Sequence, residues 1–67
     1  MITYVTANRM ELELYSGDEL VVRSADPYFL AHVADKVGGM SNTVMRSPFE
    51  VWTEEAEVLF WKLCKLV

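Results

Sequence analysis

Cysteine and histidine are nearly absent from this 67-residue chain, which holds one of each, Cys64 and His32. A single cysteine excludes an intrachain disulfide, and the two residues together give no four-ligand zinc site unless carboxylates or another chain contribute. Small domains usually depend on such crosslinks, because ordering each residue costs about 1.5 kcal/mol. We therefore expect no metal or other cofactor, and we expect apolar burial to supply most of the stability.

Basic residues are also scarce: six Lys and Arg stand against ten Asp and Glu, for a net charge of -4. The six are scattered, whereas binding to a nucleic-acid backbone requires clustered positive charge, so we expect no nucleic-acid partner. The acids cluster within residues 11–19 and 50–57, which suits a protein partner with a basic surface. Imitation of DNA phosphates is an alternative, but acidic helix starts are common for electrostatic reasons.

Long hydrophobic runs are missing as well. The longest apolar stretches have only a few residues, whereas a membrane-spanning helix needs about 20. The N-terminus lacks the basic region and the apolar run of a secretion signal, and a lone free thiol suits a reducing compartment. These features predict a soluble, cytoplasmic protein without membrane contact.

Apolar residues, in contrast, are abundant. They make up 52% of the chain, and the mean hydropathy is +0.15. A domain of this length has much surface for its volume and cannot bury all of them in its own core. Folded proteins expose apolar atoms in any case, but the lack of crosslinks favours burial against another chain. We expect a protein partner or a homodimer.

The first third of the chain is typical of strands. In "MELELY" the apolar residues alternate with acids, which predicts Met10, Leu12 and Leu14 against the core and Glu11 and Glu13 in solvent. A turn at residues 16–18 then makes residues 10–23 a hairpin. Residues 2–6, "ITYVT", form a further strand.

A helix follows, with Asp26 as its N-cap, Pro27 in its first turn and the pair at 38–39 ending it. Its apolar stripe, expected to cover the sheet, contains Phe29, Leu30, Val33, Ala34 and Val37. Residues 38–42 are expected to be a flexible connection. Residues 43–52 are expected to be an extended segment broken at Ser47-Pro48, which is either an edge strand or an irregular crossing. The whole chain, residues 1–67, is therefore predicted to be a single α+β domain of order β-β-β-α-β-α, with two helices packed on one face of a small antiparallel sheet.

The last helix, which Thr53 caps, has apolar residues on more than one side. Its predicted core arc contains Ala56, Leu59, Phe60, Leu63, Cys64, Leu66 and Val67. Elsewhere on the helix, Glu54, Val58, Trp61 and Lys65 follow one another at i, i+4, i+7 and i+11, and we call these four residues the Trp61 ridge. An aromatic and an aliphatic residue rimmed by charges are typical of a protein interface. The alternative is that the segment around Pro48 folds over Val58 and Trp61 as a satellite core.

Two residues are candidates for chemistry. His32 lies on the same helical face as Tyr28 and Asp35, which is a conceivable general base. No nucleophile accompanies it, so we interpret His32 as a surface residue. Cys64 lies on the core arc near a helix C-terminus, where the dipole disfavours a thiolate, and we interpret it as structural.

The sequence therefore favours a non-enzymatic protein-binding module that regulates or inhibits another protein by occupying its surface. Small acidic chains of this kind include inhibitors encoded by viruses and mobile elements. The alternative is a structural or assembly subunit that functions only within a larger complex or as an obligate homodimer. A third hypothesis, an enzyme that uses His32, lacks accompanying catalytic groups.

Overall fold

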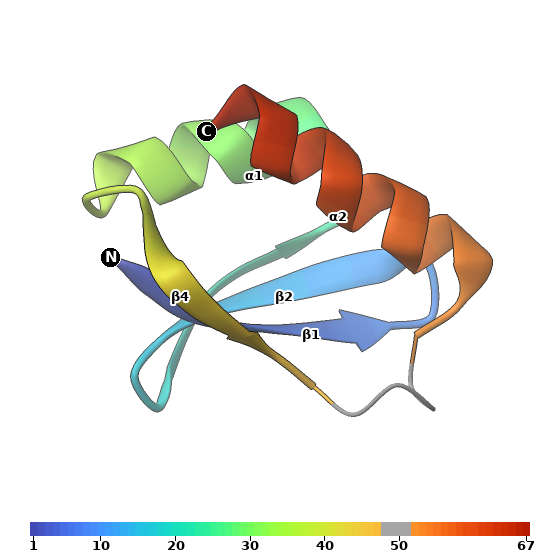
Figure 1. Ribbon diagram of the computed structural model, residues 1–67, viewed down its shortest axis with the longest axis horizontal. Coiled ribbons are helices and arrows are strands. Elements are labelled where there is room, and N and C mark those ends of the chain that lie inside the picture. Colours follow the sequence, from blue (N-terminus) through green and yellow to red (C-terminus); the bar gives the residue numbers. More distant parts are fainter. Residues whose placement is uncertain (48–51) are drawn as a thin grey trace.

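The computed structural model describes residues 1–47 and 52–67. The predicted order of elements is confirmed (Figure 1). The elements are β1 (Ile2–Asn8), β2 (Glu11–Ser16), β3 (Glu19–Ser24), α1 (Pro27–Lys36), β4 (Met40–Arg46) and α2 (Glu54–Leu66). Both helices lie on the same face of the sheet, as predicted, and the described helices and strands leave its other face uncovered (Figure 1).

The sheet has the strand order β3-β2-β1-β4 and is mixed rather than purely antiparallel. β1, β2 and β3 pair antiparallel, whereas β4 pairs parallel to β1. β4 is parallel because α1 carries the chain back to the end of the sheet where β1 and β3 begin. From there β4 runs in the same direction as β1 and β3. β4 is an edge strand, which was one of the two predicted alternatives.

Two-residue turns join the first three strands. The turn at Gly17 and Asp18 lies where the sequence predicts it. The prediction for Met10 is wrong, because Met10 belongs to the turn before β2 and is 60% exposed. The alternation that buries Leu12 and Leu14 begins only at Glu11, where the strand begins.

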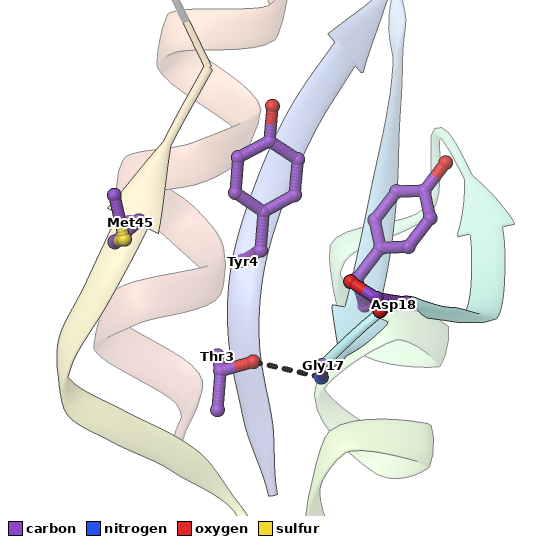
Figure 2. Close-up of a pocket in the computed structure, with 6 residues that line it drawn as sticks. Thr3, Tyr4, Gly17, Asp18 and Met45 are labelled. Carbon is purple, nitrogen blue, oxygen red and sulfur yellow. Dashed lines mark hydrogen bonds between the residues drawn. The ribbon is translucent and has the colours of Figure 1, made fainter.

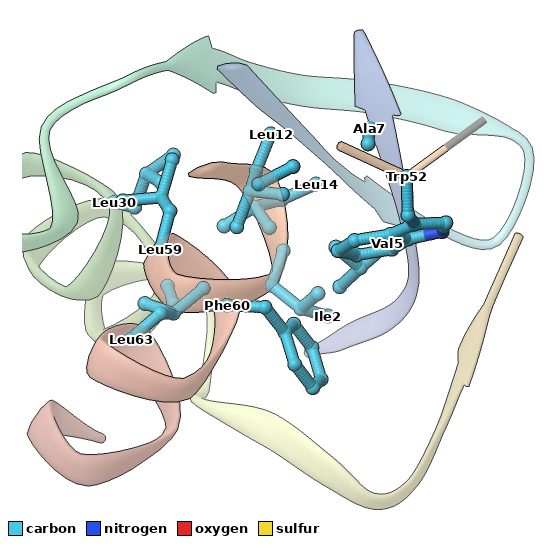
Figure 3. Close-up of a cluster of buried hydrophobic side chains, with 12 residues drawn as sticks. Ile2, Val5, Ala7, Leu12, Leu14, Leu30, Trp52, Leu59, Phe60 and Leu63 are labelled. Atoms are coloured by element: carbon cyan, nitrogen blue, oxygen red, sulfur yellow. The ribbon is translucent and has the colours of Figure 1, made fainter. Parts of the chain in front are cut away.

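The core lies between the sheet and the helices (Figure 3). Its buried residues are Ile2, Val5, Ala7, Leu12, Leu14, Leu30, Ala34, Trp52, Ala56, Leu59, Phe60 and Leu63. Besides Met10, three residues predicted for the core are exposed instead, namely Phe29 at 48%, Leu66 at 44% and Val67 at 50%. Phe29 lies in the first turn of α1, and the other two follow Leu63, the last buried residue of α2. Helix ends extend beyond the core that they cover.

The connection between α1 and β4 is shorter than predicted. Residues 40–42, expected to be flexible, form the start of β4. Gly38 and Gly39 make the turn with φ values of 100° and 88°, which glycine adopts without strain. The amide of Ile2 donates to the carbonyl of Gly39 at 2.8 Å and ties this turn to β1. The predicted chain break at Pro48 lies outside the described residues.

Candidate functional site

The Trp61 ridge lies on the solvent side of α2. The helix begins at Thr53, whose Oγ1 accepts a hydrogen bond from the Ala56 amide at 3.1 Å. All four ridge residues are exposed, with Val58 at 49% and Trp61 at 56%. The structure therefore places the four side chains on one accessible helix surface. That a partner covers them stays a prediction.

The indole of Trp61 packs against a residue of the core. Its ring meets the buried ring of Phe60 edge-on, with centroids 5.6 Å apart, and Phe60 meets Trp52 in the same way at 5.6 Å. Three aromatic rings thus lead from the core to the surface. The segment around Pro48, which the satellite-core alternative requires, lies outside the described residues.

The second tryptophan has a different role. Trp52 is only 9% exposed, and its Nε1 donates to the carbonyl oxygen of Ser47 at 3.1 Å and to Oγ of Ser47 at 2.8 Å. Buried indoles normally find such a partner. Trp52 is therefore part of the core, whereas Trp61 exposes most of its ring.

Arg46 makes contacts with α2 and with Trp52 that the sequence did not predict. Its guanidinium lies 4.3 Å from the ring centroid of Trp52 and 4.9 Å from that of Phe60, and it forms an ion pair with Glu57. Its Nε is buried without a hydrogen-bond partner among the described residues. Arg46 thereby holds the edge strand β4 against α2, next to the support of Trp61. An arginine within the largely apolar segment 43–52 was the only signal.

Val58 lines a groove between the two helices. Two adjoining hollows share Pro27 and Lys62. Their walls include Met10, Pro27, Tyr28, Glu55, Val58, Lys62, Lys65 and Leu66. Met10 and Leu66, which were expected in the core, thus add to an apolar surface beside the Trp61 ridge. Lysine and glutamate side chains border it.

A second apolar surface crosses the uncovered face of the sheet. The strand registers set Leu20 opposite Tyr15, Tyr15 opposite Tyr4, and Tyr4 beside Met45. We call these four residues the tyrosine row. The rings of Tyr4 and Tyr15 meet edge-on with centroids 5.6 Å apart, whereas Leu20 and Met45 at the ends are 47% and 66% exposed. Figure 2 views this face, with the helices behind the sheet.

A shallow hollow opens along the row. It is lined by Thr3, Tyr4, Tyr15, Gly17, Asp18 and Met45 (Figure 2). The Oγ1 of Thr3 accepts a hydrogen bond from the Gly17 amide at 2.9 Å, which joins β1 to the turn between β2 and β3. The backbone around the hollow is therefore fixed on two sides.

Three charged residues beside the row, Glu11, Glu13 and Arg23, lie close together. Arg23 lies 3.4 Å from Glu13 and 3.9 Å from Glu11, and the hydroxyl of Tyr15 donates to Glu13 at 3.2 Å. Partial burial of the ring, and then the nearby Glu13 carboxylate, raise the pKa of the Tyr15 hydroxyl above its ordinary value. Tyr15 thus stays neutral throughout the physiological range.

The residues considered for chemistry lie apart. His32, Tyr28 and Asp35 are exposed on α1. Cys64 is half-buried on α2, and burial raises the pKa of its thiol, although Arg46 acts in the opposite direction. Within residues 1–47 and 52–67, no three His, Cys, Asp or Glu side chains are grouped so as to hold a metal ion. The described helices are too short and too polar to cross a membrane.

Comparisons with protein-family models, with curated proteins and with solved structures found no match. The features that bear on function are therefore the two exposed apolar surfaces, one on each side of the domain.

Proposed function

We propose that the protein is a small non-enzymatic binding module that regulates or inhibits another protein by occupying its surface with the Trp61 ridge. The observation that carries the proposal is the exposed indole of Trp61, seated on the buried ring of Phe60. A large aromatic ring on a rigid base loses little conformational freedom on binding, which is why tryptophans recur as interface hot spots.

The surroundings of the ridge support a protein partner. Val58 continues the apolar surface into the groove between the helices, and charged residues of α2 border it. An apolar centre with a polar rim is the usual composition of a specific interface. The net charge of -4 favours a partner with a basic surface, because opposite charges accelerate encounter.

A structural or assembly subunit is the second candidate. The tyrosine row favours it, because a chain that acts alone through one ridge has no need of a second exposed apolar surface on the opposite face. The two candidates differ in the isolated chain: a regulator folds and stays monodisperse, whereas a subunit that requires neighbours aggregates or unfolds.

Affinity capture from a lysate of the encoding organism tests the first candidate. Wild type, Trp61→Ala and His32→Ala are immobilised separately, and the captured proteins are identified and their affinities measured. We expect Trp61→Ala to bind the partner about 30-fold more weakly, which corresponds to a hot spot of about 2 kcal/mol. His32→Ala, which removes an exposed ring from the other helix, is the matched control and should bind like wild type. Equal capture by Trp61→Ala and wild type would refute the proposal.

A further inference from the structure

We propose that the uncovered face of the sheet is a self-association surface, on which a second copy of this chain packs face to face across the tyrosine row. This surface lies on the opposite side of the domain from the helices (Figures 1 and 2). The inference therefore goes beyond the Trp61 ridge and is independent of it.

The geometry of the row suits a symmetric contact. The row crosses all four strands, because each of its members is the register partner of the next. In a two-fold dimer the same patch faces itself, and a row through the middle of a sheet meets its own copy wherever the axis passes near its centre. Sheets that pack face to face lie about 10 Å apart, with their side chains interdigitated. The exposed Leu20 and Met45 provide apolar surface at both ends of the row.

The charges on this face permit its burial. Arg23 lies beside Glu11 and Glu13, and Glu13 also accepts a hydrogen bond from the hydroxyl of Tyr15. Covering the row therefore leaves these groups with partners, which avoids the cost of an isolated buried charge. Asp18, which lines the end of the hollow, and Glu19 lie at the turn between β2 and β3, and both are exposed in the isolated chain.

The available area is sufficient. A standard interface takes about 800 Å² from each partner, which is slightly less than a fifth of the accessible surface of this chain, 4393 Å². One sheet face of a two-layer domain measuring 28 × 22 × 18 Å is of that order. A second copy also meets the need that the composition indicates, since a small chain without a disulfide gains stability by burying apolar surface in a dimer.

The salt dependence of binding distinguishes a second copy of this chain from a basic partner on the same face. Two identical chains of net charge -4 repel each other, so screening strengthens an apolar contact between them. A basic protein on the same face would bind more weakly as the salt concentration rises. Self-association through the tyrosine row should therefore tighten between 20 mM and 500 mM salt, on the order of several-fold.

Analytical ultracentrifugation over a wide concentration range, at both salt concentrations, tests the proposal. We expect wild type to reach the dimer mass, and we expect Met45→Asp and Leu20→Asp to weaken the dimer at least tenfold. Both substituted side chains are exposed in the isolated chain, so circular dichroism should confirm unchanged folding. Trp61→Ala is the control and should dimerise like wild type.

Three outcomes would overturn the proposal: a wild type that stays monomeric at every concentration, a dimer that both aspartate variants leave intact, or a dimer that Trp61→Ala dissociates. The last outcome would assign self-association to the Trp61 ridge. Loss of partner capture in Trp61→Ala with the dimer intact would support both proposals, so the two can fail separately.

Discussion

At the scale of single residues, exposure separates side chains that the composition cannot tell apart. Trp52 and Trp61 are chemically identical, yet one donates hydrogen bonds inside the core and the other exposes most of its ring. Leu63 and Leu66 stand three positions apart on the same helix, and only Leu63 is buried. What each side chain touches decides what its removal costs.

Truncation of Leu63 and of Trp61 should therefore have different effects. Leu63 is fully buried, so Leu63→Ala should lower the free energy of unfolding by about 2–5 kcal/mol through lost contacts and a cavity. Trp61 is 56% exposed and its ring meets that of Phe60 edge-on, so Trp61→Ala should cost about 1 kcal/mol. Urea unfolding followed by circular dichroism measures both. Outright unfolding of Trp61→Ala would mean that Trp61 is a core residue.

The thiol of Cys64 should make stability depend on alkaline pH. Burial raises its pKa in the folded chain, so the unfolded chain loses this proton first as the pH rises. The free energy of unfolding should then decline above about pH 8.5, the ordinary range of a cysteine. Cys64→Ala should remove this part of the decline, and unfolding of both proteins between pH 7 and pH 10 measures the difference. Identical pH profiles would contradict the assigned direction.

At the scale of elements, the two hairpin turns use different residues for the same backbone conformation. Arg9, before β2, has a φ of 61°, and Gly17, before β3, has a φ of 63°. Only glycine adopts such angles without steric cost. The first turn is therefore strained where the second is not.

Substitutions at the two turns should act with opposite signs. Arg9→Gly should stabilise the fold by about 0.5–1 kcal/mol, because it relieves the positive φ, and Gly17→Ala should destabilise it by about 1–2 kcal/mol. No atom lies within 4 Å of a Cβ built at Gly17, so backbone strain alone would cause the loss. Thermal unfolding of both variants checks the signs. A loss of stability in Arg9→Gly would show that its side chain has contacts that outweigh the strain.

The sequence predicted the helices and strands better than it predicted how they pair and which of their residues are buried. Alternation located Leu12 and Leu14, and Asp26 and Thr53 start the two helices as expected. These signals are local. The parallel pairing of β4, the exposure of Met10 and the position of Arg46 depend on where the chain returns after α1, and residues distant in sequence decide that.

Of the two exposed apolar surfaces, the sequence predicted one and missed the other. Helical spacing located the Trp61 ridge, because neighbours on a helix face are fixed by position in the sequence alone. The tyrosine row was not found, because its four members come from four strands and become neighbours only through the sheet register. The alternation of β2 sets Tyr15 on the same side as Glu11 and Glu13, but nothing in the sequence set it beside Tyr4.

At the scale of the whole molecule, the order of the sheet distributes stability unevenly. β2 pairs along its length with β1 and, apart from one irregularity between Leu14 and Tyr15, with β3. β4, in contrast, pairs with β1 only at Met40, Met45 and Arg46. Between these pairs β1 contributes Thr3, while β4 contributes residues 41–44. That part of the ladder is interrupted.

Amide hydrogen exchange should report this difference. We expect the amides of residues 41–44 to exchange orders of magnitude faster than those of Leu12 and Leu14, because they open without unfolding of the sheet. Exchange measured by NMR at pH 6 gives the individual rates. Equal protection in β2 and β4 would contradict the interrupted pairing, and a Thr3→Val variant, which keeps the register but removes the hydroxyl, should leave the pattern of β4 unchanged.

The inward-pointing side chain of Arg46 has a further consequence for the β4 edge of the sheet. An unpaired strand edge is a template for fibril growth, and natural proteins obstruct it with bulges and with charges that point inward. β4 has both, because its ladder is interrupted and its last residue directs a guanidinium between Trp52 and Phe60. A chain from another molecule that added to this edge would have to expel that charge from its aromatic neighbours. The β4 edge of the sheet is therefore obstructed against extension into fibres.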